Sequence, residues 1–223
     1  MAKIIIISAH PDDETLGAGG TLFKHKNSGD TLAWLIVTNI FENQGYTKAK
    51  IGERQREIDT VSKKYGFSTV YNLDYPTMGL TPEIVNSMIP KISSIFSGFC
   101  PEVIYLMNRS DAHSDHRYTF DAVVACTKSF RYPFIKKVLM YECISETEFS
   151  PALPERLFMA NYFVDITDFF NEKRGVMQIY ESELGEHPFP RSLKNIEALA
   201  IFRGASVGVE YAEAFQLIKL IDK

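Results

Sequence analysis

The sequence predicts an α/β fold, in which a Rossmann-like, mostly parallel sheet carries helices on both faces. Short, continuous runs of β-branched and apolar residues, such as residues 3–9, are typical of strands that are buried on both faces. These runs alternate along the chain with segments that read as helices. Such alternation is typical of parallel strands joined by crossover helices.

The expected elements follow from apolar periodicity and from turn residues, taken in chain order. We expect strands at residues 3–9, 31–38, 68–73, 101–107, 136–143 and 162–167. We expect helices at residues 17–28, 48–65, from 81 onward, from 116 to about 130, 167–182, 192–202 and 210–221. A polar, glycine-containing loop over residues 39–46 lies between the second strand and the second helix.

Several helix boundaries carry their own signals. Gly29 closes the first helix, and Gly66 ends the second in the usual C-terminal manner. Thr81 and Pro82 suit the N-cap and the first position of the third helix. Thr167 or Asp168 can cap the helix that follows residues 162–167.

The composition is that of an ordinary globular protein. The chain has 223 residues, of which 45% are hydrophobic and 23% are charged. No linker rich in Gly, Ser or Pro divides it. We therefore expect a single domain over residues 1–223, with a C-terminal elaboration over roughly 150–223.

Charge and apolar runs exclude several classes of partner. The net charge is −4 and the basic residues are scattered, so no surface for nucleic acid is expected. No apolar run reaches membrane-spanning length, and no signal-peptide cleavage pattern follows the first run. Cys100, Cys126 and Cys143 are odd in number and lack metal-binding spacing, which favours buried, reduced thiols. We expect a cytoplasmic protein that binds neither nucleic acid nor membranes.

Two clusters of polar residues each follow an expected strand. Residues 10–14 come directly after the strand over 3–9, and residues 113–116 follow the strand over 101–107. Open α/β sheets bind their ligands at the carboxyl ends of the strands. Because parallel strands end at the same edge of a sheet, we expect the two clusters to meet there.

Each cluster offers ligands suited to zinc. His10 and Asp13 lie three residues apart on a tight turn, and His113 and His116 lie three apart near a helix start. Neutral imidazole and carboxylate bind zinc well, and three protein ligands leave one position open for water. Zinc lowers the pKa of that water to about 7 and polarises a carbonyl oxygen. A neighbouring carboxylate, which the Asp12-Asp13 doublet can supply, would act as general base.

Each cluster also has a purely structural interpretation. The first can be a capped turn, and the second a helix start with Ser114 or Asp115 as N-cap. Two such clusters at equivalent strand ends favour a metal site. A dinucleotide-binding site is disfavoured, because the glycines over 17–20 lie several residues past the strand and lack the GxGxxG spacing.

The stretch over residues 9–21 closely resembles the signature of the PIG-L/LmbE-like zinc-dependent de-N-acetylases. Residues 111–116 resemble the second metal motif of that family, and residues 54–57 its Arg-x-x-Glu helix. Residues 164–166 and 203–215 resemble its C-terminal elements, so the resemblance covers the whole chain. It implies an LmbE-like fold and an enzyme that removes the acetyl group of N-acetylglucosamine-type sugars or glycoconjugates. The family includes homo-oligomers, so the same assembly is an option for this chain.

The resemblance also implies roles for the residues of the two motifs. Asp12 would be the general base for the zinc-activated water. His113 would stabilise the oxyanion or protonate the leaving amine, and Asp115 would fix the orientation of its ring. The zinc ligands would be His10, Asp13 and His116.

Substrate recognition is assigned to two residues. Arg54 resembles a substrate-contacting arginine of the family, and its alternative is an ion pair with Glu53 or Glu57 on the helix surface. Glu14 would contact the substrate, or it would contact the metal-binding residues without binding the metal itself. Ala112 stands where some family members place an arginine, so a substrate contact from that position is missing. The motifs therefore retain the residues for the metal chemistry but do not identify the substrate.

The main hypothesis is therefore a zinc-dependent hydrolase that deacetylates a GlcNAc-type small molecule. A second hypothesis keeps the metal but changes the substrate to another N-acyl compound or a sugar nucleotide. A third is a Rossmann-like binding protein without catalysis. Iron or another divalent ion is the alternative to zinc at a site of this composition.

Overall fold

A computed structural model describes residues 1–222 of the chain. Within them, one seven-stranded sheet has the strand order β3-β2-β1-β4-β5-β7-β6. The first five strands of this order pair in parallel, and β7 pairs antiparallel with both β5 and β6. The predicted α/β fold with a mostly parallel sheet is confirmed. The strands are β1 (Lys3–Ser8), β2 (Thr31–Asn39), β3 (Thr69–Pro76), β4 (Val103–Met107), β5 (Lys137–Tyr141), β6 (Tyr162–Asp165) and β7 (Ala212–Leu220).

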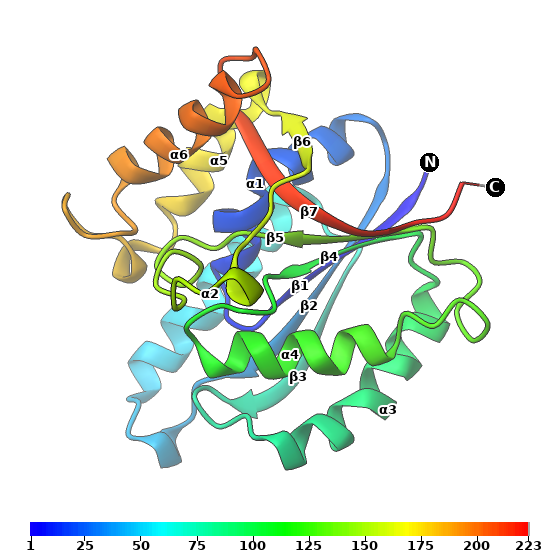
Figure 1. Cartoon of the computed structure of the whole chain (residues 1–223). Helices are drawn as coiled ribbons and strands as arrows, with labels where there is room; N and C mark the ends of the chain where they lie inside the picture. The colour runs from blue at the N-terminus through cyan, green and yellow to red at the C-terminus, as the bar shows by residue number, and fades with distance from the viewer. Residues whose placement is uncertain (223) are drawn as a thin grey trace.

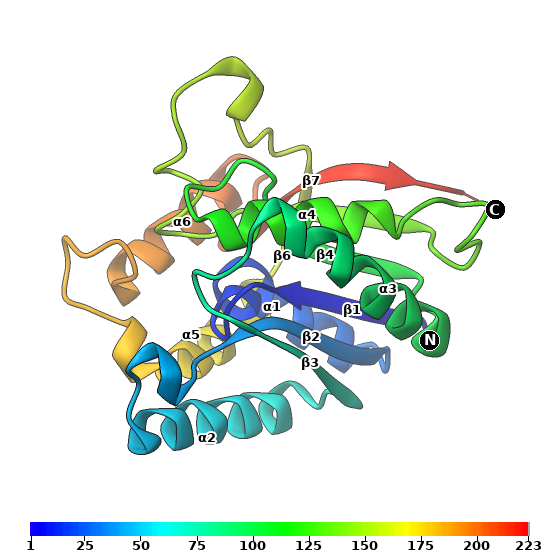
Figure 2. The same ribbon diagram turned by 90° about the horizontal axis from the view of Figure 1, so that it is seen from below.

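Helices cover both faces of this sheet (Figures 1 and 2). Helices α3 and α4 pack against each other on one face, and α1, α2 and α5 lie on the other. Helix α6 packs against β7. None of the helices within residues 1–222 is long and apolar enough to cross a membrane. The helices are α1 (Asp13–Asn27), α2 (Lys48–Tyr65), α3 (Pro82–Phe99), α4 (Ser114–Ala125), α5 (Phe170–Met177) and α6 (Leu193–Ala205).

The direction of the strand order reverses between β1 and β4. Strands β2 and β3 extend from β1 to one side, and β4 and β5 extend to the other. Open α/β sheets form a crevice at the carboxyl ends of the strands at such a reversal. The neighbouring strands β1 and β4 run parallel, with Ile4 opposite Val103 and Ile6 opposite Tyr105. The loops that follow these two strands therefore start side by side at this crevice.

The last expected helix is wrong. Residues 210–221 were expected to be helical, but β7 occupies Ala212–Leu220. Its composition, rich in Ala, Glu, Gln, Leu and Lys, favours helix in isolation. In the fold, β5 and β6 provide backbone partners on both sides of β7, and this pairing outweighs the local preference. Helix α4 also ends at Ala125, short of the expected end near Phe130.

Helix α1 lies unusually close to β5 at Gly17. A Cβ atom added at Gly17 would lie 2.1 Å from Cδ2 of Tyr141, whose ring is fully buried and whose hydroxyl donates to the carbonyl of Ile7. We expect Gly17→Ala to lower the free energy of unfolding by about 1–3 kcal/mol, because helix and ring must separate. Urea denaturation measures this value.

The matched control is Gly98→Ala in α3, where an added Cβ would meet nothing within 4 Å. That variant should be stabilised by about 0.5–1 kcal/mol, because alanine loses less backbone entropy on folding. Equal effects of the two substitutions would show that the contact between α1 and Tyr141 imposes no steric limit.

Candidate metal centre

The two polar clusters meet at the crevice between β1 and β4. One ligand atom from each of His10, Asp13 and His116 lies within 4.8 Å of the other two. His10 belongs to the loop after β1, Asp13 begins α1, and His116 lies in the first turn of α4. The structure thus brings together the three residues that were expected to hold zinc.

The His116 side chain presents an unpartnered nitrogen to this centre. Its Nδ1 donates to Asp111 Oδ2 at 2.8 Å, which leaves Nε2 as the atom with a free lone pair. Nε2 lies 3.3 Å from Asp13 Oδ1 but has no hydrogen-bond partner within residues 1–222, although His116 is only 1% exposed. Two ligands of one tetrahedral zinc ion lie about 3.3 Å apart, given bonds of about 2.0–2.2 Å. The orphaned nitrogen therefore fits a divalent cation.

His10 is held by a second carboxylate. Its Nε2 lies 3.2 Å from Asp115 Oδ2, and its backbone N–H donates to Asp13 Oδ2 at 2.8 Å. Its Nδ1 lies 3.8 Å from Asp13 Oδ2. A donor Nε2–H to Asp115 would leave Nδ1 free to bind a cation that Asp13 also contacts.

Asp115 does not orient His113 in the expected way. Its carboxylate accepts hydrogen bonds from the backbone N–H groups of Met78 and Leu80 and contacts His10, while lying 4.0 Å from His113 Nδ1. The backbone N–H of Asp115, and not its carboxylate, donates to His113 Nδ1 at 3.1 Å. These existing bonds make a second ligand set, His10, His113 and Asp115, a poorer cation site than the first.

His113 presents a hydrogen-bond donor to the cavity. Because Nδ1 accepts from the backbone of Asp115, the neutral ring carries its proton on Nε2. Burial, together with the neighbouring charges of His10 and His116, lowers the pKa of His113 to about 4. Its ring centroid lies 4.5 Å from that of His10.

Asp12 sits in a strained turn and lines the cavity. Its φ angle is 133°, a region that non-glycine residues rarely adopt. The backbone N–H of Asp12 donates to Glu14 Oε2 at 3.1 Å, and the Asp12 side chain forms no capping hydrogen bond with α1. Burial and the charges of Asp13 and Glu183 raise the pKa of Asp12 well above its usual value.

Glu14 does not reach the cavity, so its expected contact with substrate has no geometric support. It is fully buried, and its carboxylate accepts hydrogen bonds from the hydroxyls of Thr15 and Tyr180 and from the Asp12 amide. Burial raises its pKa to about 7. Glu14 therefore anchors the turn that carries Asp12.

Asp13 and His116 form a buried charge pair. Burial alone would raise the pKa of Asp13, but the charges of His116 and His10 hold it well below its usual range. Burial would lower the pKa of His116, but Asp13 and Asp111 raise it well above its usual value. Without a cation, a proton on His116 balances the buried Asp13.

The centre opens into a polar cavity of about 310 Å³. Arg54 lines it, but its guanidinium is occupied: Nη2 lies 2.7 Å from Glu183 Oε1, and Nε lies 3.3 Å from Glu57 Oε2. The predicted alternative, an ion pair with Glu57, is thus present. Arg191 contacts the other oxygen of Glu183 at 3.3 Å and donates to the hydroxyl of Ser145. Arg54, Glu183 and Arg191 thus form a connected ion-pair network in the wall of the cavity.

Breaking this wall should cost stability. The Arg54 side chain is 11% exposed, so Arg54→Ala leaves Glu57 and Glu183 short of a partner in a poorly solvated place. We expect the free energy of unfolding to fall by about 1.5–3 kcal/mol in urea denaturation. Lys48→Ala, which removes an exposed pair with Glu42, should change it by less than about 1 kcal/mol. A loss at Arg54 no larger than that at Lys48 would contradict a structural role for the pair.

Several residues of the centre were not singled out by sequence. Asp111 has no assigned role in the motif, yet it holds His116. Cys143 was expected to be a buried apolar residue, and it is buried, but its thiol also donates to Asp13 Oδ1 at 3.4 Å. Glu183 and Arg191 come from a region without a recognisable motif. Of these residues, only Asp111 could have been predicted from the sequence, because it lies five residues before His116 in the second motif.

Comparison with known proteins gives one family and several structures of the same fold. Residues 5–127 match the family PIG-L, described as GlcNAc-PI de-N-acetylase. Diacetylchitobiose deacetylase from Thermococcus kodakarensis is 22% identical over 97% of this chain and 83% of its own length.

Solved structures resemble the chain over nearly its full length. A conserved protein from Thermus thermophilus has a TM-score of 0.76 at 24% identity, covering 100% of this chain and 97% of its own. The 4-carboxy-2-hydroxymuconate hydratase of Pseudomonas putida has a TM-score of 0.71 at 18% identity, covering 100% and 98%. The N,N′-diacetylchitobiose deacetylase of Pyrococcus horikoshii has a TM-score of 0.75 at 20% identity, covering 98% of this chain and 84% of its own. Because this deacetylase and the hydratase share the fold, the reaction must be argued from the centre itself.

Proposed function

The chain belongs to the PIG-L family of GlcNAc-PI de-N-acetylases, and from this membership we propose that it is a zinc-dependent hydrolase that removes the N-acetyl group from a GlcNAc-type sugar or glycoconjugate. The observation that carries the proposal is the unpartnered, buried Nε2 of His116 beside Asp13. The deacetylase named among its relatives supports the substrate class.

His10, Asp13 and His116 would hold the metal, the two histidines through ring nitrogens without a hydrogen-bond partner and Asp13 through a carboxylate oxygen. When bound, zinc supplies Lewis acidity, which lowers the pKa of a water molecule and polarises the amide carbonyl. A set of two imidazoles and one carboxylate suits zinc, and the same set also accepts other divalent transition metals. Metal analysis of the purified protein identifies the ion.

Asp12 and His113 would perform the proton chemistry. The Asp12 carboxylate takes a proton from water as the water oxygen bonds to the acetyl carbon. The Nε2–H of His113 donates a hydrogen bond to the carbonyl oxygen as negative charge develops there. The C–N bond then breaks, acetate is released, and the amine leaves with the proton that Asp12 had taken. Of the two roles expected for His113, its tautomer favours stabilisation of the oxyanion.

Deacetylation of a defined panel tests the proposal. The zinc-loaded protein is incubated with N-acetylglucosamine, methyl N-acetylglucosaminide and N,N′-diacetylchitobiose, and acetate and free amine are quantified. We expect equimolar release of both from at least one compound. Protein with full zinc occupancy that releases neither product from any of them would overturn the proposal. Release of another acid from N-acyl compounds or sugar nucleotides would instead support the second hypothesis.

A further inference from the structure

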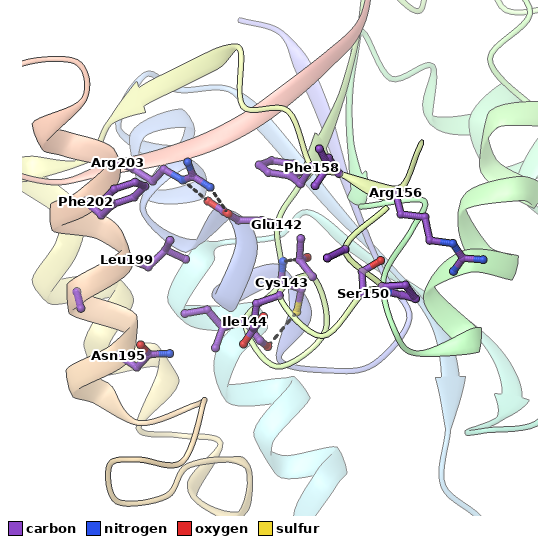
Figure 3. Close-up of a pocket in the computed structure, with 16 residues that line it drawn as sticks. Glu142, Cys143, Ile144, Ser150, Arg156, Phe158, Asn195, Leu199, Phe202 and Arg203 are labelled. Atoms are coloured by element: carbon purple, nitrogen blue, oxygen red, sulfur yellow. Dashed lines mark hydrogen bonds and ion pairs between the residues drawn. The ribbon is translucent and has the colours of Figure 1, made fainter. Parts of the chain in front are cut away.

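A second cavity lies beside the candidate metal centre. Its volume is about 560 Å³, within the range of small-molecule sites. Figure 3 shows Leu199 and Phe202 of α6 on one side and Phe158 on the other, with the segment Glu142–Ile144 between them. Phe202 is 63% exposed and Leu157 is 55% exposed, so part of this apolar wall faces solvent.

The two cavities share a wall. Cys143 lines both of them; Ser145 and Glu146 line the polar cavity, and Thr147 and Glu148 line the second. The segment is a tight turn, in which the backbone N–H groups of Glu146 and Thr147 both donate to the carbonyl of Cys143, so the partition is narrow. A molecule bound at the metal centre therefore needs only a short extension to enter the second cavity.

One pair of charges in the second cavity is matched, whereas Arg156, which also lines the cavity, has no ion pair within residues 1–222. Arg203 forms two hydrogen bonds with Glu142, of 2.8 and 2.6 Å, and both residues line the cavity (Figure 3). Glu148 accepts a hydrogen bond from the backbone of Ser145. The guanidinium of Arg203 also lies 5.3 Å from the ring of Phe202. An apolar group suits the wall that Phe158, Leu199 and Phe202 form.

We propose that this second cavity binds an apolar aglycone of the acetylated sugar. The inference rests on the proposed deacetylase function and narrows its substrate class to sugars with an alkyl or aryl substituent. An extension on the acyl side would meet Cys143, which is 1% exposed and whose thiol rests on Asp13, so the cavity floor is closed there.

Two glycosides that differ only in the aglycone test the inference. Hexyl N-acetylglucosaminide should have a kcat/KM roughly 15- to 60-fold above that of the methyl glycoside, because each of two or three buried methylenes favours binding about fourfold. Phe202→Ala should reduce this preference by about threefold or more and leave the methyl glycoside unchanged. The control is Ile201→Ala, an exposed neighbour on α6 that does not line the cavity; it should alter neither value.

Calorimetric binding of both glycosides separates failure of this inference from failure of the proposed function. Suppose that neither glycoside is deacetylated, but the hexyl compound binds more tightly and Phe202→Ala removes that preference. This result would support the apolar site and contradict the proposed deacetylase function. Equal turnover and equal binding of the two compounds overturn the site. A preference for N-hexanoyl over N-acetyl sugars that depends on Phe202 also overturns it. So does self-association of the protein, measured by sedimentation, that Phe202→Ala abolishes, because a second copy would then cover the cavity.

Discussion

Asp12→Asn should lower kcat by roughly 10²- to 10⁴-fold, the usual contribution of a positioned general base. Asp12 lines the polar cavity beside the candidate ligand Asp13, and its side chain is not used to cap α1. Asparagine keeps the shape of the side chain and tolerates the positive φ of this turn better than most residues. The substitution therefore removes the proton acceptor and leaves the turn in place.

Metal occupancy and kcat must be measured on the same preparation. We expect Asp12→Asn to bind as much zinc as the unaltered chain, because Asp12 is not among the three residues whose ligand atoms form the candidate metal centre. Glu183→Gln is the matched control: it also removes one negative charge from the lining of the cavity, but it should lower kcat far less. A zinc-loaded Asp12→Asn protein with more than a tenth of normal kcat would show that another group takes the proton.

The position of the candidate metal centre could be predicted from the sequence because the strands that lead to it could be predicted. Continuous β-branched runs identified β1 and β4 as buried parallel strands, and a polar cluster followed each. Parallel pairing then brings both clusters to one edge, which is the arrangement observed for His10, Asp13 and His116. No detailed side-chain geometry was needed for that step.

Contacts between distant segments could not be predicted in this way. Glu183, which pairs with Arg54, lies 129 residues further along the chain and carries no motif. Asp115 contacts the His113 ring through its backbone N–H, while the crevice places its carboxylate against His10, a contact that the spacing of the motif does not reveal.

Strand β7 illustrates the same limit. Its Glu213 turns inward and binds the Lys173 ammonium and the backbone N–H groups of Gly20 and Thr21 in α1. A charged residue at that position reads as the polar face of a helix when only the sequence is considered. Its partners come from two helices that are distant in the chain.

Asp111→Ala should weaken zinc binding about 10- to 100-fold, the usual effect of removing a group that orients a metal-bound histidine. Asp111 is fully buried; its Oδ2 accepts from His116 Nδ1, and its Oδ1 accepts from Asn108 at 2.9 Å and Thr147 at 2.7 Å. This bond fixes the tautomer in which His116 Nε2 is free to bind a cation at the candidate metal centre. Without it, the ring can rotate and the proton can move to Nε2.

Competition with a chromophoric chelator measures the zinc affinity of each variant. Asp111→Asn should recover part of the loss, because an amide oxygen can still accept from His116 Nδ1. Thr147→Val is the control, since it removes one donor to Asp111 and leaves the bond to His116 intact, and it should weaken binding less than Asp111→Ala. If Asp111→Ala keeps normal zinc affinity while folding normally, the orientation of His116 is set by its packing in α4 and not by this carboxylate.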